Sequence, residues 1–228
     1  MKRIEKSVEP RSLTEYRSRI SHSELLDSNV YENFPKKTKE GCNKREVDNL
    51  RKQLLEEQGY ICCYCMSRIN CNNSKIEHLK PQSIYKNLQI DYSNLFVACN
   101  GGEGNKANQQ FCDTKKGESE FKYLDLLRNI ENDLEYEKIG QNGIKIFSNN
   151  TDLNSDIENI LNLNIRILMK NRKEAYNKTI ENLKSRGFSI SNIKKVKEYF
   201  MKKHNGKYEP FCQMIVYFLT KKLKSKGV

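Results

Sequence analysis

The chain reads CCYC at residues 62–65, IEHLKP at 76–81, NLFVAC at 94–99 and CDTKK at 112–116, and these four stretches decide its fold. Cys62 and Cys65 are separated by two residues, a spacing at which two thiolates can bind one tetrahedral zinc ion through a tight turn. Cys99 and Cys112 are the best candidates for the other two ligands. The sequence therefore predicts a structural Zn²⁺ bound by these four cysteines.

Other readings of the eight cysteines are open at this level. Cys63 or Cys71 competes for a place in the zinc site, because both lie near the C-x-x-C pair. The thiols can also be small hydrophobic residues buried in a core without a metal. Cys42 and Cys212 have no partner at a ligand spacing, and Cys212 is expected to pack on an apolar helix face.

A carboxylate and an imidazole stand side by side between the two cysteine pairs. Glu77 and His78 fall in a predicted strand that runs into a loop at Pro81. Neighbouring side chains of a strand point to opposite sides, so the two meet a common substrate only if the strand ends there. Asn94 lies just before the second cysteine pair, and Asp113 follows Cys112 directly.

Charge points to a polyanionic partner. The chain has 41 Lys and Arg residues against 29 Asp and Glu residues, a formal net charge of +12 at pH 7. Each phosphate contact releases condensed counterions, so such a surplus favours nucleic acid, with an acidic protein partner as the alternative. No secretory signal and no apolar stretch of membrane-spanning length is apparent, which predicts a cytoplasmic protein. In that compartment clustered cysteines are typical metal ligands.

Helical periodicity flanks the motifs on both sides. Residues 43–58 predict an amphipathic helix that stops at Gly59, with an apolar face formed by Val47, Leu50, Leu54 and Leu55. After a turn at residues 142–143, Ser155 and Glu158 resemble a capping box for a helix that continues to Leu183 and ends at Gly187. Ser191 and Pro210 predict the starts of two more helices.

Read in order, the motifs give C-x-x-C, E-H, N-L, C and C-D-x-x-K. This order resembles the HNH endonuclease family, in which cysteine pairs brace a ββα-metal hairpin around D/E-H, N and a final H, N or D. More narrowly, the first half of the chain resembles the Septu anti-phage nuclease subunits (PtuB) and retron-associated HNH proteins. The narrower resemblance adds a Gln-Gly before the C-x-x-C pair, Ser83 after Pro81, and Lys116.

The resemblance implies a role for each matching residue. His78 would be the general base that takes a proton from the attacking water, and an unperturbed imidazole pKa of about 6.5 keeps it largely neutral in the cytosol. Glu77 and Asp113 would bind a catalytic Mg²⁺ or Mn²⁺. Asn94 would hold the loop that carries His78 without touching the metal. Asp113 stands where many HNH proteins have His or Asn, and two carboxylates favour a hard cation.

We therefore expect an α+β chain: a small zinc-braced ββα-metal core with flanking helices in residues 1–125, and a helical region in residues 126–228. The expected function is metal-dependent hydrolysis of DNA, as the nuclease effector of an anti-phage complex. The resemblance also implies an ABC-type ATPase partner of the PtuA kind, and a helical face of residues 193–200 or 211–218 would suit such docking. The alternative is a non-catalytic zinc-knuckle subunit that binds nucleic acid or assembles a complex.

Overall fold

The computed structural model describes residues 1–27, 29–37 and 45–228. Its strands are β1 (Ser74–His78), β2 (Leu95–Cys99), β3 (Glu135–Ile139) and β4 (Gly143–Phe147). Its α-helices are α1 (Arg11–Ser18), α2 (Val30–Lys37), α3 (Arg45–Glu57), α4 (Cys112–Lys116), α5 (Thr151–Ser155), α6 (Arg166–Ser185), α7 (Ile190–Met201) and α8 (Cys212–Lys224). The chain is thus α+β, with two small hairpins and a C-terminal region rich in helix, and at this level the predicted fold class is confirmed.

The first hairpin joins the E-H and N-L motifs. Strands β1 and β2 pair antiparallel, with Glu77 opposite Phe96 and His78 opposite Leu95. Strand β1 ends at His78, as the approach to Pro81 predicts. Helix α4 follows β2 after a glycine-rich loop, in which Gly101 has φ 51° and its backbone passes so close to Phe111 that a Cβ would lie 1.9 Å from the Phe111 carbonyl oxygen. Only glycine allows that approach.

Helix α3 matches the periodicity of the sequence. Leu50, Leu54 and Leu55 are fully buried, and Val47 is half-buried against the same core. The helix extends from Arg45 to Glu57, so it ends one residue before the predicted Gln58. The predicted first residues, 43 and 44, lie outside the described residues, as does Cys42.

The capping box predicted at Ser155 is wrong. Helix α5 starts earlier, at Thr151, and its cap is Asn150, whose side chain accepts a hydrogen bond from the Leu153 amide. Ser155 ends α5, and the chain continues into a π-helical turn, η7 (Asp156–Ile160). The cause is visible at Asp156, which is fully buried because its carboxylate accepts three backbone N–H groups. These donors belong to Lys122, Tyr123 and Leu124.

The predicted helix to Leu183 is also interrupted, because Asn162 has a left-handed φ of 49° and separates η7 from α6. The starts of the last two helices, α7 and α8, each differ by two residues from the prediction. Ser189, not Ser191, caps α7 by accepting a hydrogen bond from the Asn192 amide. Pro210 lies two residues before α8, because Phe211 is left-handed (φ 56°) and its amide donates to the Met66 carbonyl.

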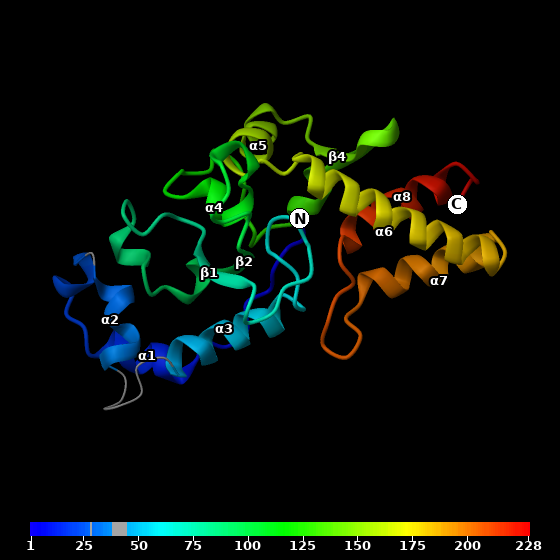
Figure 1. The fold of residues 1–228 in the computed structure, drawn as a ribbon. Coiled ribbons are helices and arrows are strands. Elements are labelled where there is room, and N and C mark those ends of the chain that lie inside the picture. Colours follow the sequence, from blue (N-terminus) through cyan, green and yellow to red (C-terminus); the bar gives the residue numbers. More distant parts are fainter. Residues whose placement is uncertain (28, 38–44) are drawn as a thin grey trace.

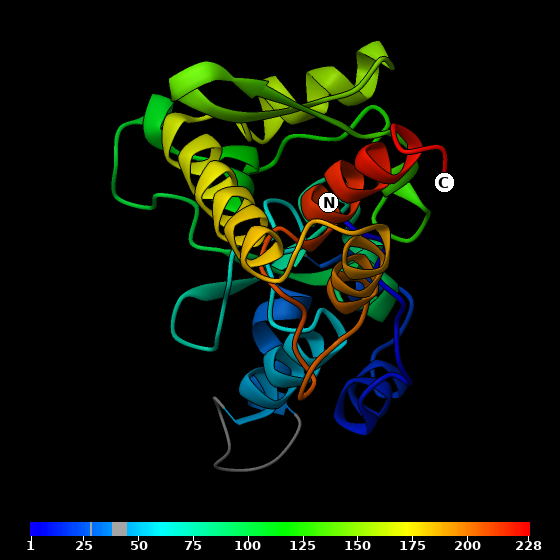
Figure 2. The ribbon, with the colours of Figure 1, turned by 90° about the vertical axis from the view of Figure 1, so that its right-hand side faces the viewer.

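The three long C-terminal helices gather at one end of the molecule, opposite α1 and α2, with β1, β2 and α4 between them (Figure 1). Figure 2 shows α6, α7 and α8 lying close together below the β3–β4 hairpin, which the sequence did not predict. One cluster of buried side chains extends from Met1 to Leu223. Among the described helices, none is long and apolar enough to cross a membrane.

Candidate metal centre and adjoining site

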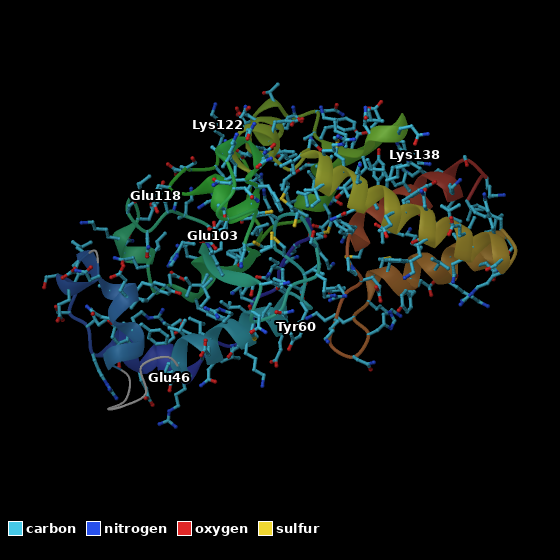
Figure 3. The ribbon with its side chains drawn as sticks, in the orientation of Figure 1. Glu46, Tyr60, Glu103, Glu118, Lys122 and Lys138 are labelled. Carbon is cyan, nitrogen blue, oxygen red and sulfur yellow. The ribbon has the colours of Figure 1, made fainter. Side chains whose placement is uncertain are left out.

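Four thiols converge where the cysteine-rich segment of residues 62–71 (the cysteine knuckle), β2 and α4 meet. The Sγ atoms of Cys62, Cys65, Cys99 and Cys112 all lie within 4.8 Å of one another. Cys62 and Cys65 come from the turn before β1, Cys99 ends β2, and Cys112 begins α4. In Figure 3 sulfur atoms, drawn in yellow, gather near the middle of the molecule, close to the labelled Glu103. These are the four cysteines that the sequence predicts as ligands.

The spacing of these thiols suits a tetrahedral ion. A Zn–S bond of about 2.3 Å places two sulfurs of a regular tetrahedron about 3.8 Å apart. The Sγ atoms of Cys65 and Cys99 are 3.8 Å apart, and those of Cys62 and Cys112 are 3.9 Å apart. The Cys99 amide also donates to the Cys62 sulfur at 3.3 Å. The cluster could therefore bind a structural metal such as zinc.

The pKa values of the thiols show why a cation would stabilise this cluster. Burial raises the pKa of Cys62, but hydrogen bonds, first of all from Cys112, lower it more, so the pKa lies well below its ordinary value. Burial and the neighbouring Cys62 hold the pKa of Cys112 well above its ordinary value. One thiolate of the cluster is thus favoured over a second one, because like charges repel at this distance. A divalent cation would remove that repulsion.

The competing ligands lie outside the cluster. Cys63 is buried and its amide donates to the Val97 carbonyl, but its thiol is not among the four that cluster. Cys71 is exposed. Cys212 is buried in the face that α8 turns to the core, as predicted.

Glu77, in β1, is held in a buried ion pair. Its Oε1 atom accepts from the Lys116 ammonium at 2.9 Å and from the Tyr64 hydroxyl at 2.8 Å. The two charged side chains are 4% and 1% exposed, so this pair is out of water. Burial and the neighbouring Asp113 carboxyl raise the pKa of Glu77 well above its ordinary value, and Lys116 opposes that shift.

Asp113 stands beside Glu77 at the start of α4. Its carboxyl is close enough to raise the Glu77 pKa, and one of its oxygens lies 3.9 Å from the Lys75 ammonium. Lys75 in turn pairs with Glu103 at 2.7 Å. The Asp113 side chain is 20% exposed, more than Glu77, so it forms the water-facing part of the carboxylate pair.

His78 is oriented by backbone. Its Nε2 atom lies 2.9 Å from the Gln89 carbonyl oxygen, which can only accept, so Nε2 carries the hydrogen and Nδ1 is left as the basic nitrogen. Burial lowers the pKa of His78, and the hydrogen bond to Gln89 opposes this shift. The ring of Tyr31 packs edge-on at 4.7 Å. The imidazole is therefore neutral near pH 7, in a single tautomer.

Asn94 joins the two ends of the loop that follows His78. Its Oδ1 atom accepts the Lys80 amide at 2.7 Å, and its Nδ2 atom donates to the carbonyls of Lys80 at 3.0 Å and Leu88 at 3.1 Å. Asn94 is itself buried at the end of the turn before β2. Three hydrogen bonds from one side chain thus determine the path of the chain between His78 and Gln89.

Sequence reasoning missed three residues of this site. Lys116 belongs to the C-D-x-x-K motif, and its position one helical turn after Asp113 is the signal that could have revealed it. Besides Glu77, its ammonium donates to the His78 carbonyl at 3.0 Å. Tyr64 lies between the cysteines of the knuckle, so its position in the sequence suggests a structural residue and does not indicate the contact with Glu77. Gln89 acts through its carbonyl, which no sequence pattern indicates.

No protein-family model matches this chain, and no curated protein matches it. Function is therefore inferred from the residues themselves and from the order of their motifs.

Proposed function

We propose that this protein is a metal-dependent endonuclease of the HNH type, which hydrolyses phosphodiester bonds of DNA at Glu77, His78 and Asp113. The hairpin of β1 and β2 followed by α4 would then be the ββα-metal core of that family. One observation supports this most strongly: a neutral, backbone-oriented histidine follows directly on a carboxylate that faces a second carboxylate. A zinc-knuckle subunit without catalysis has no need of that arrangement.

His78 is the general base of this proposal. The Gln89 carbonyl holds the proton on Nε2, so Nδ1 can accept a proton from water. The lowered pKa keeps the ring in its neutral, basic form at neutral pH. Asn94 has a positioning role, because it ties Lys80 to Leu88 across the loop that presents the imidazole.

Glu77 and Asp113 fit a hard divalent cation by their donor chemistry. Two carboxyl groups close enough to perturb each other form an oxygen-only donor set, which Mg²⁺ or Mn²⁺ prefers. Such a cation would supply Lewis-acid stabilisation of the phosphate and the leaving oxygen. Lys116 already neutralises part of the Glu77 charge, so we expect the cation to bind tightly only together with a substrate phosphate.

An anti-phage role and an ABC-type ATPase partner rest on the Septu resemblance alone. The structure bears on which helical faces are free for docking. In the two predicted faces, Ile193, Phe211 and Met214 are buried, whereas Val196, Phe200 and Phe218 are half-buried. Docking of an ATPase would therefore have to use the half-buried side chains Val196, Phe200 and Phe218.

The test is cleavage of supercoiled plasmid by the zinc-loaded protein with Mg²⁺ or Mn²⁺. We expect His78→Ala to lower the rate by about 10²–10⁴-fold, the usual loss on removal of a general base. His22→Ala is the matched control, because that imidazole is exposed and belongs neither to the proposed active site nor to the four-thiol cluster. Cleavage by His78→Ala at the wild-type rate would refute the mechanism and leave the non-catalytic reading in front.

A further inference from the structure

The net positive charge of the chain comes from residues 166–228, which form its C-terminal helices. Residues 166–228 contain 17 Lys and Arg against 4 Asp and Glu, a net +13, whereas residues 1–165 contain 24 against 25, a net −1. Across the described parts of the chain, none of those 17 basic side chains forms an ion pair with a carboxylate. One end of the molecule is therefore strongly cationic and not neutralised from within.

A groove of about 890 Å³ lies on this end, between α6, α7 and the segment that leads into α8. Its apolar lining is Ala175, Val196, Phe200 and Phe211. Its basic lining is Arg68, Lys178, Arg186 and Lys195. Glu174 and Glu209 also line it.

The groove contains an exposed aromatic ring in a defined position. Tyr199 is 43% exposed, although its ring stacks on His204 at 3.9 Å and its hydroxyl donates to Glu209 at 3.1 Å. Glu209, one of the two acidic side chains of the lining, is thus occupied as a hydrogen-bond acceptor of Tyr199. Cationic side chains beside an exposed aromatic ring are the usual means of holding a single nucleic-acid strand, because phosphates pair with the cations and bases stack on the ring.

We propose that this groove binds a single nucleic-acid strand, with Lys178, Arg186 and Lys195 on the phosphates and Tyr199 against a base. The charge split favours a polyanion, and the exposed ring favours nucleic acid over an acidic protein. The groove also reaches the cysteine knuckle, since its lining includes Ser67 and Arg68, which lie two and three residues after Cys65. The inference deepens the proposed function by naming the surface that holds the substrate, but binding there does not require the chemistry at His78.

The test compares two double charge reversals in the full-length, zinc-loaded protein. Lys178→Glu/Lys195→Glu changes the groove, and Lys52→Glu/Lys122→Glu is the matched control on exposed lysines of the N-terminal region, of which Lys122 is labelled in Figure 3. The probe is fluorescein-labelled 20-mer oligodeoxythymidylate, measured by anisotropy between about 0.05 and 0.3 M NaCl without divalent cation. Circular dichroism and melting temperature check that both variants fold.

We expect the groove variant to bind at least roughly tenfold more weakly at 0.1 M salt. Its slope of log affinity against log salt should fall by about 1.4, since each single-strand phosphate contact contributes about 0.7. The control variant should lose less than about threefold. Tyr199→Ala should lose roughly fivefold or more with an unchanged salt slope, because stacking is not electrostatic.

Equal losses in the two charge variants would overturn the groove as the binding surface. Tighter binding of a 20-base-pair duplex that Tyr199→Ala does not weaken would overturn the single-strand assignment. The protein could instead bind labelled poly-L-glutamate and not the oligonucleotide. If the groove variant then weakened the binding of poly-L-glutamate, the partner would be an acidic protein. Failure here is distinct from failure of the nuclease proposal, because His78→Ala should keep full binding while it loses cleavage.

Discussion

The buried pair of Glu77 and Lys116 gives the sharpest test of the site, and Lys116→Met is the perturbation. Methionine keeps an unbranched side chain that is one atom shorter, but it leaves the Glu77 carboxyl without its cation and the His78 carbonyl without its donor. Removal of one partner from a buried ion pair costs about 3–5 kcal/mol. For a chain of this size each kcal/mol shifts the melting temperature by about 2–4 °C, so we expect a decrease of roughly 6–20 °C.

The loss should depend on pH in a defined direction. Burial and Asp113 already raise the pKa of Glu77, and Lys116→Met removes the group that opposes them. The folded protein then keeps a proton that the unfolded chain releases above about pH 4.3. The free energy of unfolding of the variant should therefore fall further behind wild type as the pH rises from 5 to 8, and approach it at lower pH.

Urea unfolding followed by circular dichroism measures this effect, with zinc present and Mg²⁺ absent. Lys115→Met is the matched control: it is the preceding residue of α4, is partly exposed, and should change stability by less than about 0.5 kcal/mol. The double variant Glu77→Gln/Lys116→Met should recover about 1–3 kcal/mol relative to the sum of the single changes. A Lys116→Met variant that loses less than about 1 kcal/mol, equally at pH 5 and pH 8, would refute the coupling.

Three further outcomes are expected. Cys112→Ser should lose bound zinc by metal analysis and unfold the core, whereas Cys71→Ser should keep the full zinc content, and equal zinc in both would contradict the four-thiol site. Asn94→Ala should destabilise the protein by about 1–3 kcal/mol and lower kcat with little change in KM, and a purely raised KM would argue against a positioning role. Truncation after Gly187 should cause aggregation, because α8 buries Met214 and its neighbours, and a soluble fragment that melts as wild type does would show that these helices are not core.

The sequence predicted correctly those parts of the structure that depend on residues close together in the chain. The periodicity of α3 alone indicates which leucines are buried, and Pro81 after Glu77-His78 indicates where β1 ends. The four zinc-ligand candidates were predicted from spacing, but the choice against Cys63 needed the structure. Cys62 and Cys63 are adjacent in the chain, and only the fold shows that Cys62 is the one whose thiol lies with those of Cys65, Cys99 and Cys112.

The elements that the sequence mispredicted depend on distant contacts. Ser155 and Glu158 satisfy a capping pattern, but Asp156 is drawn inward by backbone N–H groups some 30 residues earlier in the chain, so the chain forms a π-turn there instead. The hairpin of β3 and β4 was missed because Asn142-Gly143 was taken as a boundary before helix. Ion pairs such as Lys116 with Glu77 are equally invisible, since they link positions that are 39 residues apart.

The metal centre and the proposed active site share backbone, which limits how they can be separated experimentally. Cys112 begins α4 and Asp113 is its next residue, so any ligand change at Cys112 also moves a carboxylate that faces Glu77. A hairpin and a five-residue helix bury too little surface to hold that geometry alone, so the cysteine cluster and the core packed around β2 hold it together. Loss of activity in a cysteine variant therefore cannot distinguish a structural ion from a catalytic one. His78 and Asn94 are outside the thiol cluster, and only variants there can test the chemistry with the zinc site intact.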